Sequence, residues 1–207
     1  RARRNGLRII GPSSMGIASP RPETRLQAAL VDVTLPPGGV AISMQSGSLG
    51  ASLLNLAAQM SMGLSWFVSL GDKSDVSGND LLQYWEADAA TSLILLYLES
   101  IGNPRKFTRI TRRLSRTKPV VAVRSGRYTQ TLPLGHHVRR TTLPAGAVDA
   151  VFEQSGVIQT SSLGELFDVA AVLAYQPLPR GDSVAVVGTS AALEILAADA
   201  IESVRMT

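Results

Sequence analysis

Hydrophobic residues along this chain gather in short continuous runs, and longer segments with helical periodicity separate these runs. Residues 40–44, Val-Ala-Ile-Ser-Met, form one such run, which ends at a Ser/Gly turn before a helix-like segment. Continuous apolar runs are typical of parallel strands that are covered on both faces. The pattern predicts strands at residues 7–10, 40–44, 66–69, 93–98, 120–124, 157–160 and 184–187. It predicts helices at residues 47–62, 79–89, 104–116, 145–155, 163–175 and 191–203.

The alternation of strands and helices predicts an α/β fold with a parallel sheet and right-handed crossover connections. Ser162 and Glu165 have the spacing of a capping box at a helix start. Pro104 and Pro144 fit first-turn positions, where a missing N–H has no cost. Three segments break the alternation: residues 20–37 with four prolines, the basic segment 128–144 and the stretch 177–181. We interpret the first of these as a linker or an extended crossing segment.

The composition is that of an ordinary globular core, with 45% hydrophobic and 17% charged residues among 207. No apolar run reaches the length that crosses a bilayer, and no signal peptide opens the sequence. The chain has no cysteine, which excludes disulfides and fits a cytoplasmic location. Two adjacent histidines are too few for a structural zinc site. We therefore expect no metal centre and no membrane association.

The net charge is +4, and only three of the 20 basic residues are lysines. Arginines recur at helical spacing within residues 105–116, which predicts a solvated helix face. Aromatic residues make up only 5% of the chain and do not interleave with the arginines, so we expect no nucleic-acid partner. Phosphorylated small molecules fit the same charge better.

The Ser46-Gly47-Ser48 turn is the first candidate for chemistry, because it joins a predicted strand to a predicted helix. The first backbone N–H groups of a helix have no partner within it, and the helix dipole adds partial positive charge there. Serine hydroxyls and a glycine suit a phosphate or another anion at such a turn.

Three further features follow predicted strands: Glu99, the segment Gly71-Asp72-Lys73-Ser74-Asp75, and the loop with His136 and His137. Taken singly, each is also typical of an ordinary solvated turn. Parallel strands end at the same edge of a sheet, so these features are expected on one rim with the serine turn. A carboxylate on Nδ1 of a histidine would leave Nε2 as nucleophile or base. The order Ser, acid, His also suits a serine hydrolase, but Ser46 replaces the first glycine of the Gly-x-Ser-x-Gly elbow.

Several motifs in order resemble the NDP-forming acyl-CoA synthetases, relatives of the succinyl-CoA synthetase α-subunit. The motifs are Gly11-Pro12-Ser13-Ser14-Met15-Gly16, Ser43-Met44-Gln45-Ser46-Gly47-Ser48-Leu49-Gly50, Ser69-Leu70-Gly71-Asp72-Lys73-Ser74-Asp75-Val76, Tyr97-Leu98-Glu99-Ser100, and Lys118-Pro119-Val120-Val121 with the loop that follows. The resemblance implies a flavodoxin-like, three-layer parallel sheet. It also implies a reversible reaction in which acyl-CoA, ADP and phosphate give acid, CoA and ATP through a phosphohistidine.

In residue terms, the resemblance implies that Ser46, Gly47 and Ser48 cradle the phosphohistidine. It places the phosphohistidine at His137 and its imidazole partner at Glu99. Ser13, Ser14, Gly71 and Asp75 are expected at the CoA-facing rim of the active site. The expected cofactors are CoA and ATP or ADP, with Mg accompanying the nucleotide. Separate CoA-binding and ATP-grasp domains would supply them, so this chain alone is not expected to turn over acyl-CoA.

Catalytic segments depart from the family pattern. The family's Ser-His-Thr-Gly-Ala becomes His136-His137-Val138-Arg139-Arg140, Ser13 replaces an asparagine, and a second phosphate loop becomes Gly188-Thr189-Ser190-Ala191. These changes suggest an impaired ligase. The alternative is a non-catalytic, acyl-CoA-sensing domain fused to a GNAT lysine acetyltransferase, as found in this family. The acyl group, the nucleotide and homo-oligomer formation stay open.

For domain organisation, residues 1–20 are expected to be the tail of a CoA-binding Rossmann domain. Residues 21–176 would form the flavodoxin-like domain, and residues 177–207 would begin a third α/β subdomain. The chain is therefore expected to be a fragment of a larger protein.

Overall fold

A computed structural model describes residues 2–125, 145–177, 180–204 and 206. The chain divides into two compact units, Arg1–Tyr175 and Gln176–Thr207. The first unit is built around one sheet and its helices, and it carries the candidate site. Among its described residues, the second unit has one helix, α6 at Ala191–Ser203.

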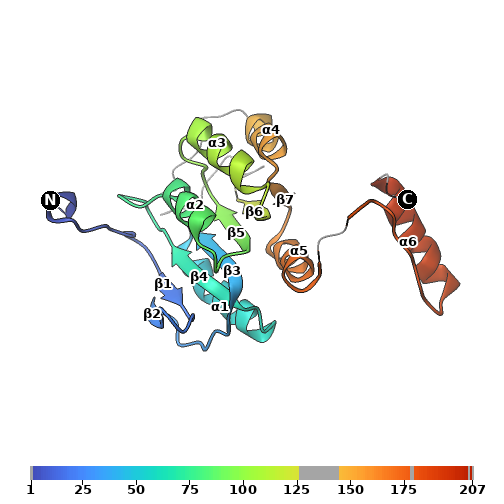
Figure 1. The fold of residues 1–207 in the computed structure, drawn as a ribbon, viewed down its shortest axis with the longest axis horizontal. Helices are drawn as coiled ribbons and strands as arrows, with labels where there is room; N and C mark the ends of the chain where they lie inside the picture. Colours follow the sequence, from blue (N-terminus) through green and yellow to red (C-terminus); the bar gives the residue numbers. More distant parts are fainter. Residues whose placement is uncertain (1, 126–144, 178–179, 205, 207) are drawn as a thin grey trace, which may run out of the picture. The chain divides into compact units, whose positions relative to one another are not determined.

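The seven-stranded sheet of the first unit has the order β2-β1-β4-β3-β5-β6-β7 (Figure 1). Its strands are β1 Gly16–Ser19, β2 Leu26–Ala29, β3 Pro37–Met44, β4 Leu64–Ser69, β5 Leu93–Leu98, β6 Val120–Arg124 and β7 Ile158–Thr160. Strands β3 to β7 pair in parallel, whereas β1 is antiparallel to both β2 and β4. The doubly wound, flavodoxin-like α/β fold predicted from sequence is thus confirmed, with an antiparallel pair added at one edge.

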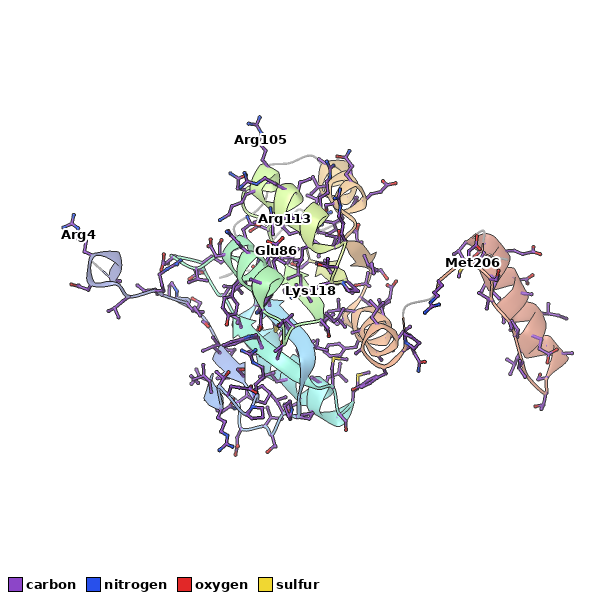
Figure 2. All side chains as sticks on the ribbon, viewed as in Figure 1. Arg4, Glu86, Arg105, Arg113, Lys118 and Met206 are labelled. Carbon is purple, nitrogen blue, oxygen red and sulfur yellow. The ribbon has the colours of Figure 1, made fainter. Side chains whose placement is uncertain are left out.

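In the described part of the first unit, five helices accompany the sheet: α1 Gly47–Gln59, α2 Gly78–Ala87, α3 Pro104–Leu114, α4 Ala145–Ser155 and α5 Leu163–Tyr175. A short 3-10 helix occupies Ala2–Asn5. Helices α2, α3 and α4 cover one face, and α1 and α5 cover the other. Neighbouring helices of one layer are also joined at the surface, where Glu86 of α2 pairs with Arg113 of α3 (Figure 2).

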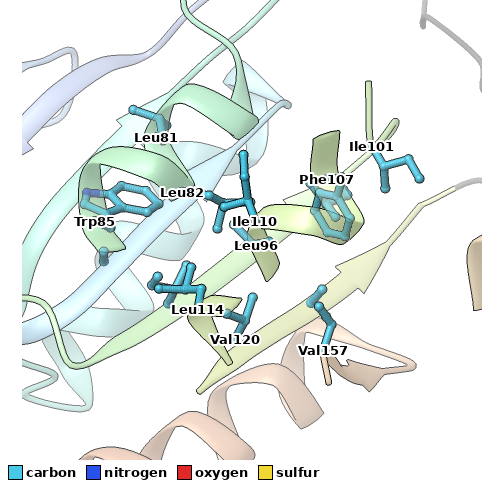
Figure 3. Packing of buried hydrophobic residues seen from close by; sticks show 14 of the residues in the cluster. Leu81, Leu82, Trp85, Leu96, Ile101, Phe107, Ile110, Leu114, Val120 and Val157 are labelled. Carbon is cyan, nitrogen blue, oxygen red and sulfur yellow. The ribbon is translucent and has the colours of Figure 1, made fainter. Parts of the chain in front are cut away.

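Two apolar clusters form the core, one on each face of the sheet. Trp85, Phe107 and Phe152 belong to the cluster under α2, α3 and α4 (Figure 3), and Leu54 and Phe167 belong to the other. Along β5, alternate side chains enter opposite clusters: residues 94, 96 and 98 enter the first, and residues 93 and 95 the second. A strand that is buried on both faces cannot alternate with polar residues, which explains its continuous apolar sequence.

Helix prediction agrees closely with the structure, and local capping explains why. Helix α3 starts after Asn103, whose side chain accepts a hydrogen bond from the N–H of Lys106 (3.0 Å), and Pro104 occupies its first turn. At α5, Ser162 Oγ accepts from the N–H of Glu165 (3.2 Å). The Glu165 carboxylate accepts from the N–H of Ser161 (2.7 Å), one residue before the capping-box position. Pro144 lies outside the described residues.

Strand prediction was wrong at three places. Residues 7–10 and 184–187 do not join a ladder, and Leu7 and Val187 are 61% and 95% exposed. Within residues 20–37, interpreted as a linker, the structure has strand β2, and it has the unpredicted strand β1 just before. Each contains only one large apolar residue, Ile17 in β1 and Leu26 in β2, so neither forms an apolar run. Residues 16–19 therefore contribute a strand to the same sheet as residues 37–173.

Candidate functional site

The candidate site lies at the edge of the sheet where β3, β4 and β5 end. These strands are parallel, so the loops that follow them meet at one rim. The Ser46 turn follows β3, the Gly71 loop follows β4, and Glu99 follows β5. The prediction that these three segments lie at one edge of the sheet is thus confirmed.

The Ser46 turn forms because α1 begins there with a serine N-cap. Ser46 Oγ accepts from the N–H of Leu49 at 3.4 Å and lies 3.2 Å from Ser48 Oγ. Ser48 is exposed, and Ser46 and Gly47 are half-buried. The turn therefore presents hydroxyl groups and a helix start at the rim, which together favour an anion.

Gln45 joins the Ser46 turn to the Glu99 loop. Its side chain is only 6% exposed, and its Oε1 accepts from the N–H groups of Glu99 (3.0 Å) and Ser100 (2.9 Å). Its Nε2 donates to the carbonyl oxygen of Ser100 (2.8 Å). Three hydrogen bonds from one buried amide fix the backbone that carries the Glu99 carboxylate. We did not single out Gln45 from sequence, although a polar residue directly after a buried strand was the available signal.

Residues 8–16, named here the N-terminal strap, lie along the loop after β4. The N–H of Asp72 donates to the carbonyl of Pro12 (2.9 Å), and Ser13 Oγ donates to the Asp72 carboxylate (2.9 Å). Ser14 Oγ donates to the carbonyl of Ser69, and Ser69 Oγ accepts from the N–H of Met15 (2.9 Å). The hydroxyl groups of Ser13 and Ser14 thus bind the protein itself in this structure.

Two glycines allow the strap to approach the site closely. Gly71 has φ +54°, and a Cβ there would lie 2.0 Å from the carbonyl oxygen of Pro12. A Cβ on Gly47 would lie 2.9 Å from the carbonyl oxygen of Ser13. Ser13 therefore sits between the Gly71 loop and the first residue of α1, and the structure brings these three predicted residues together.

Asp75 also binds the strap. Its Oδ2 accepts from the N–H of Ile9 (3.0 Å) and from Nε of Arg8 (2.8 Å), and the side chain is 8% exposed. The hydrogen bond and charge of Asp75 raise the pKa of the Arg8 guanidinium. Asp75 therefore binds Arg8 and Ile9, the first two residues of the strap, and fixes their position beside the loop after β4.

Lys73 adds positive charge to the rim, which we did not anticipate. Its Nζ donates to Ser100 Oγ (2.7 Å), so it connects the loops after β4 and β5. Its φ of +53° is uncommon for a residue with a side chain, and such backbone conformations concentrate at functional sites.

The predicted histidines, His136 and His137, lie outside the described residues, so the structure does not place an imidazole beside Glu99. Glu99 itself is half-buried. At the end of β6, Arg124 is a further charged residue, with a side chain only 7% exposed and Nη2 at 3.8 Å from Asp149 Oδ1. Its buried Nε has no hydrogen-bond partner within the described ranges.

Within the part of the chain that the structure describes, no three His, Cys, Asp or Glu side chains converge as metal ligands. In that same part, no helix combines the length and apolar character that a bilayer span requires. The rim instead combines a serine turn, a carboxylate and a lysine, groups that can hold a phosphate and orient a proton-carrying base.

Comparison with known proteins gives consistent matches. The family described as succinyl-CoA ligase like flavodoxin domain matches residues 37–173. The chain is 32% identical, over 97% of its length, to subunit alpha of ADP-forming acetate–CoA ligase I of Pyrococcus furiosus, and covers 43% of that relative. It is 27% identical to ADP-forming 4-hydroxybutyrate–CoA ligase of Nitrosopumilus maritimus, covering 99% of this chain and 30% of that one.

A solved structure of similar fold is acetyl-coenzyme A synthetase 1 of Ca. Korarchaeum cryptofilum in complex with phosphate and ADP. It matches with a TM-score of 0.88 and 29% identity, over 98% of this chain and 44% of that chain. The chain thus spans less than half the length of each of these relatives.

Proposed function

Because this chain belongs to the family of succinyl-CoA ligase-like flavodoxin domains, we propose that it is the ligase domain of an ADP-forming acyl-CoA synthetase. The relatives at 32% and 27% identity are ADP-forming CoA ligases, which supports this reaction class. The overall reaction would convert acyl-CoA, ADP and phosphate into acid, CoA and ATP, and would be reversible. Since the chain spans less than half of those relatives, the CoA-binding and ATP-grasp domains would come from elsewhere in the protein or from a partner.

The observation that carries the proposal is the Gln45 bridge between the Ser46 turn and the Glu99 loop. We assign the Ser46–Ser48 turn to the phosphoryl group and Glu99 to Nδ1 of the His137 imidazole. With Nδ1–H bonded to Glu99, the lone pair of Nε2 would attack the phosphorus of an acyl phosphate. The acyl phosphate would form when a phosphate oxygen attacks the acyl carbon of acyl-CoA and the C–S bond breaks, releasing CoA as the thiol. On attack by Nε2, the bond from phosphorus to the acyl oxygen breaks, and the carboxylate leaves. Attack by a terminal phosphate oxygen of ADP on the same phosphorus then restores the imidazole and forms ATP.

The described residues fit a phosphate at the serine turn better than they fit CoA. The Ser46 turn has the helix start and hydroxyl groups that an anion needs, while Ser13 and Ser14 use their hydroxyl groups within the strap. We therefore assign the strap a positioning role beside CoA, which would bind mainly to a neighbouring domain. Nucleotide and its Mg would bind to the ATP-grasp part, and we expect the protein in the cytoplasm.

The alternative function is a non-catalytic domain attached to a GNAT acetyltransferase. The sequence observation in its favour is the bulky, basic neighbourhood of His137, residues 138–140, in place of small family residues. The relatives reported above are ligases and synthetases, so we retain the ligase as the first candidate.

The two functions are separated by phosphorylation of the whole protein, with its nucleotide-binding part present. Labelled ATP, or acetyl-CoA with labelled phosphate, is expected to give an acid-labile, base-stable label. His137→Ala should abolish the label and His136→Ala should retain it. Glu99→Gln should lower the labelling rate at least tenfold, while Glu153→Gln, at an exposed position of α4, serves as the matched carboxylate control. Absence of label from both histidines in the unmodified protein would reject the ligase and support the regulatory function.

A further inference from the structure

An open groove lies along helix α3 where it faces α4, and its volume is about 670 Å³. Val151 of α4 lines this arginine groove, together with five arginines of α3 and the turn after it: Arg105, Arg109, Arg112, Arg113 and Arg116. Beneath it the two helices pack closely, with the ring centroids of Phe107 and Phe152 only 5.8 Å apart. Their ends are also joined, because Ser115 Oγ donates to the carbonyl of Ser155 (2.8 Å). The groove is therefore preformed.

The arginines of the groove form a regular stripe. Residues 105, 109 and 112 have the spacing i, i+4, i+7, which places them on one side of α3 over a length of about 10 Å. Arg116 continues the lining in the turn after the helix. Each of these four residues is exposed, and Arg105 extends outward from the first turn of α3 (Figure 2).

Cations of α3 that face α2 have carboxylate partners. Lys106 Nζ lies 3.0 Å from Asp80 Oδ1, and Arg113 pairs with Glu86. Helix α2 thus supplies one carboxylate for each cation that α3 directs towards it.

The arginines directed into the groove have no such carboxylate. Within the described ranges, Arg105, Arg109 and Arg116 make no hydrogen bond or ion pair. Arg112 donates to a neutral group, the backbone carbonyl of Gln154 (3.3 Å). The stripe therefore keeps its positive charge.

The segments beside the groove do not neutralise that charge either. The acidic residues of α4, Asp149 and Glu153, line a separate hollow and not this groove. Residues 126–144, which join β6 to α4 along the chain, contain no Asp or Glu. The complementary charge must therefore come from another molecule.

Helix formation does not explain the stripe. The first turn of α3 contains Arg105 and no acidic residue, although the helix dipole disfavours a cation there. Arginines at i, i+4 spacing also repel one another. Sequences depart from such local preferences mainly where function requires it.

The lining of the groove identifies the kind of anion. Its floor contains Val151, Pro104 and the aliphatic stems of the arginines, which a purely ionic ligand would leave in contact with water. No aromatic side chain is among the lining residues that the structure describes, so a stacking platform for nucleic-acid bases is absent there. A small phosphorylated molecule would span only part of the stripe. A helix with carboxylates at i, i+4 and i+7 matches its spacing, and apolar residues between them can cover the floor.

We propose that the arginine groove is a docking site for an acidic, amphipathic helix of a partner protein. Carboxylates on successive turns of that helix pair with Arg105, Arg109 and Arg112, in the forked geometry that guanidinium groups favour. Apolar side chains of the partner pack on Val151. The site is formed by α3 and α4, so it is independent of the phosphohistidine chemistry assigned to the rim.

Binding is tested with synthetic peptides and the purified chain, without nucleotide or CoA. The probe is a fluorescent helical peptide of about 18 residues, with glutamates at i, i+4, i+7 and i+11 and leucines beside them. Its control has the same composition with the glutamates distributed around the helix. At low salt we expect a Kd on the order of 10 μM for the patterned peptide. The control should bind at least tenfold more weakly. Equal affinities, or no binding of the patterned peptide, would overturn the proposal.

Variants locate the binding. Arg105→Gln combined with Arg109→Gln should weaken the patterned peptide at least tenfold. The matched control, Arg4→Gln combined with Arg25→Gln, removes two exposed arginines outside the groove and should change the affinity less than twofold. Equal losses in the two double variants would show non-specific attraction to net charge and reject the site.

Competing polyanions test the chemical class of the partner. Val151→Thr keeps the shape of the side chain but makes the floor more polar, so it should weaken the patterned peptide about threefold. Inorganic polyphosphate and oligouridylate should displace the peptide poorly. Tighter binding of either polymer than of the peptide, unaffected by Val151→Thr, would replace the protein partner with a phosphate polymer and overturn the proposal.

Discussion

The two edges of the parallel sheet use polar residues in different ways. At the amino edge, Asp88 after α2 accepts from Arg21 Nη1 (3.0 Å), Trp66 Nε1 (3.0 Å) and Thr91 Oγ1 (2.8 Å). The Arg21 guanidinium also lies 4.8 Å from the Trp66 ring centroid. Lys118 Nζ donates to the carbonyls of Trp85 and Asp88, each at 2.7 Å, and so caps α2.

At the carboxyl edge, polar side chains connect separate loops instead of gathering on one carboxylate. Gln45 accepts from the N–H of Glu99 (3.0 Å), and Lys73 donates to Ser100 Oγ (2.7 Å). Backbone strain does not distinguish the two edges, because positive φ values occur at Ser13 and Lys73 and also at Arg25 and Ser61. The comparison indicates that the amino edge closes one compact network, whereas the carboxyl edge uses its polar groups to position the loops of the candidate site.

The largest effect is expected from the carboxyl edge, at Gly71. Gly71→Ala places a methyl group 2.0 Å from the carbonyl of Pro12 and requires positive φ from alanine. We expect the free energy of unfolding to fall by about 3–4 kcal/mol. Urea unfolding measures this change.

Gly146→Ala is the matched control, because a Cβ there meets nothing within 4 Å in helix α4. It should leave stability unchanged or raise it by up to ~1 kcal/mol. Equal stability of the two alanine variants would show that the strap does not pack on Gly71 as described.

Asp88→Ala is the corresponding change at the amino edge. It leaves Arg21, the Trp66 indole N–H and Thr91 without their shared acceptor, so we expect a loss of about 2–3 kcal/mol in unfolding free energy. Histidine phosphorylation of the assembled protein, measured at a temperature where the variant is folded, should be unaffected. A large loss of phosphorylation in that folded variant would contradict the division between the two edges.

Gln45→Ala, in contrast, should reduce histidine phosphorylation more than it reduces stability. Loss of the amide leaves the N–H groups of Glu99 and Ser100 unpaired, which costs about 1–2 kcal/mol. Because Glu99 loses its fixed position, we expect the phosphorylation rate to fall by more than the stability change predicts, at least tenfold. Gln159→Ala, which removes an amide that donates to Asp149 Oδ1 (2.9 Å), is the control and should leave the rate unchanged.

Acid should weaken the amino edge through Asp88. Burial acts to raise the pKa of Asp88, but the hydrogen bonds from Thr91, Ala90 and Trp66 and the charge of Arg21 lower it overall. A carboxyl whose pKa is lowered by folding contributes stability above its unfolded value, about 3.9, and that contribution disappears as pH falls through the folded value. Unfolding free energy should therefore drop below about pH 4. In Asp88→Asn this drop should be shallower, and an identical acid profile would exclude Asp88 as a contributor.

The smallest effect is expected at the surface pair between Glu86 and Arg113. The Arg113 hydrogen bond lowers the pKa of Glu86, but Arg113 is 56% exposed, so water and salt screen the interaction. Glu86→Gln should cause no measurable change in Tm at 0.5 M salt. A larger destabilisation than in Asp88→Ala would mean that surface charge outweighs the buried network.

Much of the fold followed from the sequence because its signals are local. Helix α3 is defined by Asn103 and Pro104, and β5 by six successive apolar residues. Strands β1 and β2 were missed because each contains only one large apolar residue, Ile17 or Leu26, and so lacks the apolar run that predicts a strand.

The candidate site was only partly predictable for a related reason. Ser46 and Glu99 were found because strand ends meet at one rim. Gln45 is visible in the sequence as a polar residue after a buried strand, but its partner Glu99 lies 54 residues away and has no local signal. The Gly71 contact with Pro12 likewise depends on tertiary approach. Asp75 illustrates the same point, because its bonds to Arg8 and Ile9 span 67 and 66 residues.

The arrangement of the strap has a mechanical consequence. Its attachments follow one another along the chain, from Asp75 at Arg8 and Ile9, through Asp72 at Pro12, to Ser69 at Met15. Tension applied to the chain before Arg8 would break them one at a time, starting at the water-exposed ion pair. Ser13 would separate from Gly47 only after the bonds at Arg8, Ile9 and Pro12 had opened. A weak force on the chain before Arg8 would therefore leave the start of α1 in place. Amide hydrogen exchange would report that order, with Ile9 exchanging before Met15.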